Sequence, residues 1–133
     1  MNNWLTPALR ISKTVAQAIL LILTLFWIVF AVLSGAEEQG GGFKGLIKNI
    51  PNALPWLVLL AFNFLIYRFN LIGGIVIFLF SWFCFFAFNM YEQKSGAVFF
   101  LIFVPLLIIS LIFIGNGIMN IRLKAMDAGD ISK

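Results

Sequence analysis

Histidine is absent from this 133-residue chain, and cysteine occurs once, as Cys84. Without histidine the chain lacks the commonest metal ligand and the usual proton shuttle at neutral pH. It also lacks the usual ligand of haem iron. A single cysteine forms no intrachain disulfide, so it gives no information about the redox compartment. We therefore expect no metal and no other cofactor.

Charged residues are also scarce, at 11% of the sequence against about 25% in ordinary soluble domains. All acidic residues fall outside the long apolar runs: Glu37, Glu38, Glu92, Asp127 and Asp130. An acid within a span is the usual mark of a proton relay or an ion-coupled carrier, and that mark is missing.

The sequence contains no motif typical of a metalloprotease, a serine hydrolase or a phosphate-binding loop. We therefore expect no catalytic residues and no enzyme activity. The nine basic residues are scattered along the chain, which argues against a nucleic-acid partner.

Apolar side chains, in contrast, are abundant. The sequence is 62% hydrophobic and includes sixteen phenylalanines and four tryptophans. A soluble domain of this size could not hide so much apolar surface, because small domains keep a large fraction of their area in contact with water. The lipid bilayer is therefore the expected surrounding of most of the chain.

Four apolar runs divide the sequence, at residues 15–33, 53–67, 71–88 and 96–119. A membrane-spanning helix needs about 20 residues, and in lipid every backbone polar group must be bonded within the segment. The second run is short, so its helix should begin earlier, near Pro51. The sequence thus predicts an all-α fold, an integral membrane four-helix bundle that forms one domain over residues 1–133.

The first connection is the longest. Residues 34–42 are rich in glycine and should be flexible. The following segment FKGLIKNI, residues 43–50, has apolar side chains on one helical face and lysines on another. It is either a short helix lying on the membrane surface or an extension of the second span.

Basic residues predict the orientation. With four spans, one side holds six of them: Arg10, Lys13, Arg68, Arg122, Lys124 and Lys133. The other side holds three: Lys44, Lys48 and Lys94. The positive-inside rule then predicts that both termini are cytoplasmic. In an alternative interpretation the first run is a signal peptide cleaved after residues 34–36, which would leave three spans.

Several polar or small residues lie within or next to the spans and are candidates for packing or for a site. They are Gln17, Thr24, Asn63, Ser81, Asn116 and Asn120, together with Pro105, which should kink the last helix. In the second span, Trp56, Asn63, Tyr67 and Asn70 share one helical face. The polar set either forms hydrogen bonds between helices or lines a path for a solute, and the absence of charge favours the first interpretation.

The stretch LIYRFNLIGG, residues 65–74, predicts a tight hairpin between the second and third spans. Tyr67 should anchor at the membrane interface, Arg68 should contact lipid headgroups or helix-end carbonyls, and Asn70 should cap the third helix. Gly73 and Gly74 should form a notch that lets the second helix approach closely.

This stretch, with VPLLIISLIFIGNGI later in the chain, resembles a family of small bacterial four-span membrane proteins of unassigned function. Residues 67–69 and 71–74 match the aromatic–basic–aromatic turn and the Leu-Ile-Gly-Gly of that family, whereas Asn70 replaces the usual acid. The resemblance implies a multi-pass protein of the bacterial inner (plasma) membrane and implies no activity.

From these observations we expect a non-enzymatic membrane protein that acts through helix–helix contacts. It would be a homo-oligomer or an accessory subunit of another membrane protein. The alternative is a channel, a small carrier or a membrane-permeabilising effector formed by oligomerisation.

Overall fold

The computed structural model describes residues 5–90, 96–97 and 99–130. Its elements, in chain order, are α1 Leu5–Ser34, α2 Gly42–Asn49, the 3-10 turn η1 Ile50–Ala53, α3 Leu54–Arg68, α4 Asn70–Ala87, the π-helical stretch η2 Phe99–Phe103 and α5 Val104–Asp130. The described residues contain no strand, so the predicted all-α class is confirmed.

Four helical stretches are long and apolar enough to cross a membrane, and this is therefore a multi-pass membrane protein. The stretches are Thr6–Ser34, Gly42–Arg68, Asn70–Ala87 and Phe99–Met126. The first begins well before the apolar run at residue 15. The second includes α2 and η1, which lead into α3 without a linker. The segment FKGLIKNI is thus helical and continuous with the second span.

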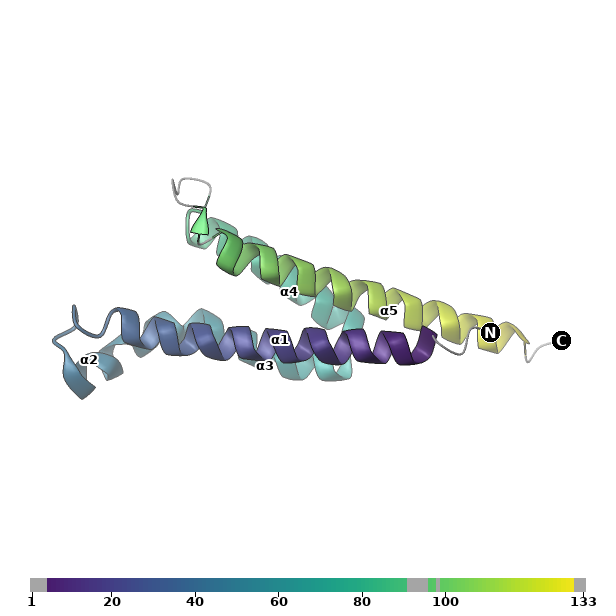
Figure 1. Cartoon of the computed structure of the whole chain (residues 1–133), viewed down its shortest axis with the longest axis horizontal. Helices are drawn as coiled ribbons and strands as arrows, with labels where there is room; N and C mark the ends of the chain where they lie inside the picture. Colours follow the sequence, from purple (N-terminus) through teal and green to yellow (C-terminus); the bar gives the residue numbers. More distant parts are fainter. Residues whose placement is uncertain (1–4, 91–95, 98, 131–133) are drawn as a thin grey trace.

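The helices form a four-membered ring in which α1 packs on α3, α3 on α4, α4 on α5, and α5 on α1. Figure 1 shows both termini at one end of the bundle, which we call the terminal end, and α2 at the other, the loop end. The α4–α5 pair diverges from the α1–α3 pair toward the loop end (Figure 1).

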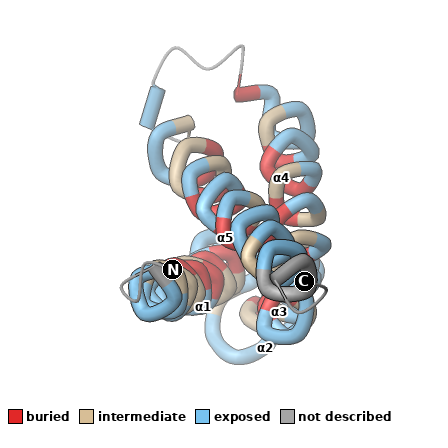
Figure 2. Tube along the Cα trace, turned by 90° about the vertical axis from the view of Figure 1, so that its right-hand side faces the viewer, coloured by how far each residue is buried: buried red, intermediate tan, exposed pale blue. Residues whose placement is uncertain are grey.

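Buried residues lie on the sides of the helices that face one another (Figure 2). Fully buried examples from the four long helices are Leu20, Leu59, Ile77 and Phe113. Even in the best-buried span, only 39% of the most apolar window is buried inside the chain. The remaining apolar surface must contact lipid or other helices, because it could not remain in water.

Pro105 lies near the start of α5, directly after η2. Proline has no backbone N–H to donate to the preceding turn, which leaves a gap in the helical hydrogen-bond ladder. This gap falls on the amino-terminal side of Pro105, and the wider π-helical turns of Phe99–Phe103 lie on that side. A change from π-helix to α-helix therefore lies next to Pro105, where the sequence predicted a kink.

Three glycines allow close contact between helix backbones. A Cβ atom on Gly73 would lie 2.8 Å from Ile66 Cα of α3, and one on Gly74 would lie 2.8 Å from the Ile114 nitrogen of α5. A Cβ on Gly117 would lie 2.8 Å from Leu71 Cα of α4. Gly73 thus faces the second span as predicted, whereas Gly74 faces α5. Together Gly74 and Gly117 bring α4 and α5 into direct backbone contact.

The replacement Gly117→Ala tests this contact. The new methyl group would overlap the α4 backbone, which cannot yield as a flexible side chain can. We expect a loss of about 1–3 kcal/mol in unfolding free energy, the usual range for overpacking. Reversible unfolding in mixed micelles measures it.

Gly115→Ala is the matched control, because a Cβ there meets nothing within 4 Å. It lies in the same helix and should leave stability unchanged or slightly raised, since alanine has the higher helix propensity. Equal stability of the two variants would contradict the proposed backbone contact.

Candidate functional site

Among the described residues, no group of histidine, cysteine, aspartate or glutamate side chains could hold a metal ion. The candidates for function are instead the polar groups inside the bundle. They gather in three places: at the loop end around Asn49, in a groove between α1 and α3 around Asn63, and at the terminal end where α1, α4 and α5 meet.

At the loop end, Asn49 caps the carboxyl end of α1. Its Nδ2 donates to the carbonyl oxygens of Ala31 at 2.7 Å and Val32 at 2.9 Å. The last carbonyls of a helix have no partner within the helix, so this amide supplies what the helix lacks. Asn52 Nδ2 in turn donates to Asn49 Oδ1. The amide of Asn49 is thereby bonded through both its nitrogen and its oxygen.

Close approach of α2 to α1 places Asn49 there. A Cβ on Gly45 would overlap the Ala36 carbonyl oxygen, and one on Gly35 would lie 2.6 Å from Asn49 Oδ1. Sequence reasoning did not single out Asn49. Asn49 follows Lys48 directly in the amphipathic segment at residues 43–50, but no local pattern indicates its hydrogen-bond partners. These partners, Val32 and Ala31, lie 17 and 18 residues earlier in the chain.

The buried hydroxyl groups bond within their own helices. Thr24 Oγ1, Ser81 Oγ and Ser110 Oγ each donate at 2.7 Å to a carbonyl three or four residues earlier. This pairing satisfies the hydroxyl groups without a partner on another helix. Two of the predicted candidates, Thr24 and Ser81, are thus buried at helix contacts and have their donors occupied.

Asn63 is different. It is 5% exposed, and neither Nδ2 nor Oδ1 has a hydrogen-bond partner among the described residues. An unpaired buried amide costs about 1–3 kcal/mol, and the surrounding lipid offers no hydrogen bond in its place. The place of Asn63 near the middle of the second apolar run predicts that it faces protein or water and not lipid, and its burial is consistent with this prediction.

Asn63 lines a hollow of about 370 Å³ between α1 and α3, which we call the Asn63 groove. Its other lining residues are Gln17, Leu21, Leu60, Phe64 and Tyr67. Of the face predicted for the second span, Trp56 and Asn63 are buried, whereas Tyr67 is 74% exposed and Asn70 belongs to α4. The inward face of α3 instead continues from Asn63 to Ile66.

At the terminal end, α1 is tied to two other elements. Ser12 Oγ and the Asn116 side chain of α5 lie within hydrogen-bond distance, at 3.1–3.2 Å. Lys13 Nζ donates to the Tyr67 carbonyl oxygen at 3.2 Å and lies 5.7 Å from the centre of the Tyr67 ring. Lys13 therefore caps the end of α3. Arg68, which was predicted to contact lipid headgroups or helix-end carbonyls, is exposed.

Asn70 does not cap α4, contrary to the sequence-based prediction. Phe69 occupies the N-cap position with an extended backbone, φ −133° and ψ 90°, and no side chain caps the helix. Asn70 is instead the first helical residue, and its Oδ1 is covered without a hydrogen-bond partner. Asn120, another predicted candidate, is exposed on α5 and faces the same hollow as Asn70.

In the comparison with known proteins, residues 1–125 match the model of a family described as a domain of unknown function (DUF7670). No curated protein and no solved structure matches the chain.

The replacement Asn49→Leu tests the loop-end cap. It would leave the Ala31 and Val32 carbonyls without a donor in a buried site. We expect a loss of about 2 kcal/mol in unfolding free energy, from the usual cost of an unsatisfied polar group. Reversible unfolding in mixed micelles measures the change.

Lys48→Leu is the control, because it makes the neighbouring residue apolar at an exposed position. This variant should keep the stability of the unaltered chain. A stable Asn49→Leu protein would mean that water or the α1 backbone itself can satisfy the two carbonyl groups.

Proposed function

We propose that this chain, which belongs to the DUF7670 family, is a non-enzymatic membrane protein that works by binding a second copy of itself through the Asn63 groove. The observation that carries the proposal is the buried, unpaired amide of Asn63 in a groove on the outer surface of the α1–α3 pair.

A second copy suits this groove chemically. A side-chain amide has both donors and an acceptor, so two Asn63 side chains related by a two-fold axis satisfy each other. The described lining of the groove includes no charged residue, and the groove therefore suits a membrane-embedded partner. Gln17 adds a second amide along the same contact. The Asn63 amide atoms are covered in the single chain, so docking must first displace a neighbouring side chain.

The exposed rim of the groove supports the same proposal. Phe64 is 76% exposed and Tyr67 74% exposed, and both are large apolar or amphipathic side chains beside the amide. Helix association in lipid depends on close packing together with interhelical hydrogen bonds. The groove offers both, with Asn63 at its base and aromatic rings at its edge.

A channel or carrier is less well supported. Such a path needs polar groups free to contact a solute, whereas the hydroxyl groups of Thr24, Ser81 and Ser110 bond to their own helices. We further propose that both termini are cytoplasmic, since five of the seven basic residues that the structure describes lie toward the terminal end, and only Lys44 and Lys48 lie at the loop end.

Disulfide trapping in membranes tests the self-association. In a Cys84→Ala background, Phe64→Cys introduces a single thiol at the rim of the groove. We expect this variant to form a cross-linked dimer on oxidation. Leu79→Cys is the control, because Leu79 is 62% exposed on α4, away from the groove, and should not cross-link.

Adding Asn63→Leu to the Phe64→Cys protein should weaken the dimer by about threefold to twentyfold, the range of interhelical hydrogen bonds in membranes. The single chain should remain folded, because leucine removes an amide that has no partner there. Undiminished cross-linking would contradict a role for Asn63. Cross-linking to a different membrane protein would instead make the chain an accessory subunit.

A further inference from the structure

Two adjoining hollows lie at the terminal end, where α1 begins, α3 turns into α4, and α5 passes by. Their volumes are about 400 Å³ and about 250 Å³. They share Lys13, Asn70 and Asn120, which stand between them. We call the pair the basic hollow.

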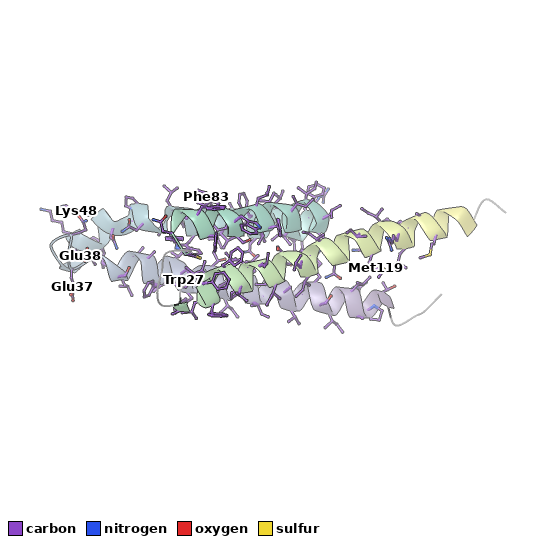
Figure 3. The ribbon with its side chains drawn as sticks, turned by 90° about the horizontal axis from the view of Figure 1, so that it is seen from above. Trp27, Glu37, Glu38, Lys48, Phe83 and Met119 are labelled. Atoms are coloured by element: carbon purple, nitrogen blue, oxygen red, sulfur yellow. The ribbon has the colours of Figure 1, made fainter. Side chains whose placement is uncertain are left out.

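The described lining of the basic hollow is cationic. It includes Arg10, Lys13, Arg68 and Lys124, and it includes no acidic residue. Glu37 and Glu38 lie at the opposite end of the bundle (Figure 3). The basic side chains come from α1, from the end of α3 and from α5, so the fold gathers charges that are scattered in the sequence.

The amino end of α4 lies at the same place. Phe69, Asn70, Leu71 and Ile72 all line the larger hollow, and no side chain caps this 18-residue helix. The first backbone N–H groups of a helix have no partner within it, and the helix dipole adds positive potential there. Such a helix end binds phosphate readily when basic side chains surround it.

The apolar part of the lining indicates a lipid. Ile72 and Ile121 line the larger hollow and are 52% and 56% exposed, so exposed apolar surface borders the basic side chains. A free phosphate ion would use neither the isoleucines nor their position at the membrane.

We propose that the basic hollow binds the phosphate of an anionic phospholipid. The phosphate oxygens accept hydrogen bonds from the first turn of α4 and from the surrounding basic side chains, while the acyl chains lie along Ile72 and Ile121. Basic pockets between membrane helices bind anionic headgroups in this way. The site lies at the end of the bundle that the positive-inside rule assigns to the cytoplasm, where anionic lipids are enriched.

Lipid retention tests the proposal. The full chain is purified from bilayers that contain equal amounts of phosphatidylglycerol and phosphatidylcholine, and the bound lipid is counted by native mass spectrometry. We expect the protein to retain more phosphatidylglycerol than phosphatidylcholine. The double variant Arg68→Gln with Lys124→Gln should bind it about tenfold to thirtyfold more weakly, from the contribution of each basic residue beside an anionic surface.

The matched control is Lys44→Gln with Lys48→Gln, which removes the same charge from two exposed residues of α2. Thermal unfolding in phosphatidylcholine alone verifies that both variants fold. The control should still retain phosphatidylglycerol. If both double variants lose the lipid equally, the lipid is held by non-specific attraction to positive charge, and the proposal is overturned. No loss in either variant would also overturn it.

Inorganic phosphate provides the last comparison. At millimolar concentration it should neither displace the retained lipid nor raise the thermal stability of the delipidated chain. If phosphate alone stabilises the chain as well as phosphatidylglycerol does, the hollow binds a free anion and the lipid proposal fails. None of the four changed residues is in the described lining of the Asn63 groove, so failure of this proposal and failure of the self-association proposal can be told apart.

Discussion

Lipid offers no hydrogen bonds, and this constraint decides where each polar group of the chain is placed. Thr24 and Ser81 bond to their own helices, Asn49 bonds to the end of α1, and Ser12 pairs with Asn116. Each pairing either satisfies a group locally or ties two helices together. Three described side chains depart from this pattern: Trp27 Nε1 and Asn70 Oδ1 are each covered without a partner, and Asn63 lacks a partner at both amide atoms. The cost of the Asn63 amide is therefore not offset within the single chain.

Close backbone contact between α4 and α5 complements these hydrogen bonds. Gly74 and Gly117 remove the side chains that would separate the two helices, so that Leu71 of α4 lies against α5. In lipid, where the hydrophobic effect does not hold helices together, such packing is a main source of association. The same contact holds the first turn of α4 beside α5. The basic hollow therefore depends on the glycines as well as on its charged residues.

The spans could be predicted from sequence because hydropathy is a local property, and the burial of Asn63 followed from its place in the middle of an apolar run. The hydrogen-bond partners of the polar side chains could not be predicted in this way. Ser12 and Asn116 are 104 residues apart, and no single-chain pattern links them. The prediction that Asn70 caps α4 failed because Phe69 already adopts the extended backbone of the N-cap. Gly74 was recognised as a packing residue, yet which helix it faces depends on the bundle as a whole.

The two ends of the bundle differ chemically, and this difference links orientation to binding. At the loop end a side-chain amide caps α1, and acids accompany lysines there. At the terminal end α4 begins without a side-chain cap, among four basic residues of the described lining. An uncapped helix start beside cations is stabilised by an anion, and at a membrane surface the abundant anions are lipid phosphates. Four of the six basic residues on which the proposed orientation rests are thus the residues that would hold a lipid once the chain is inserted.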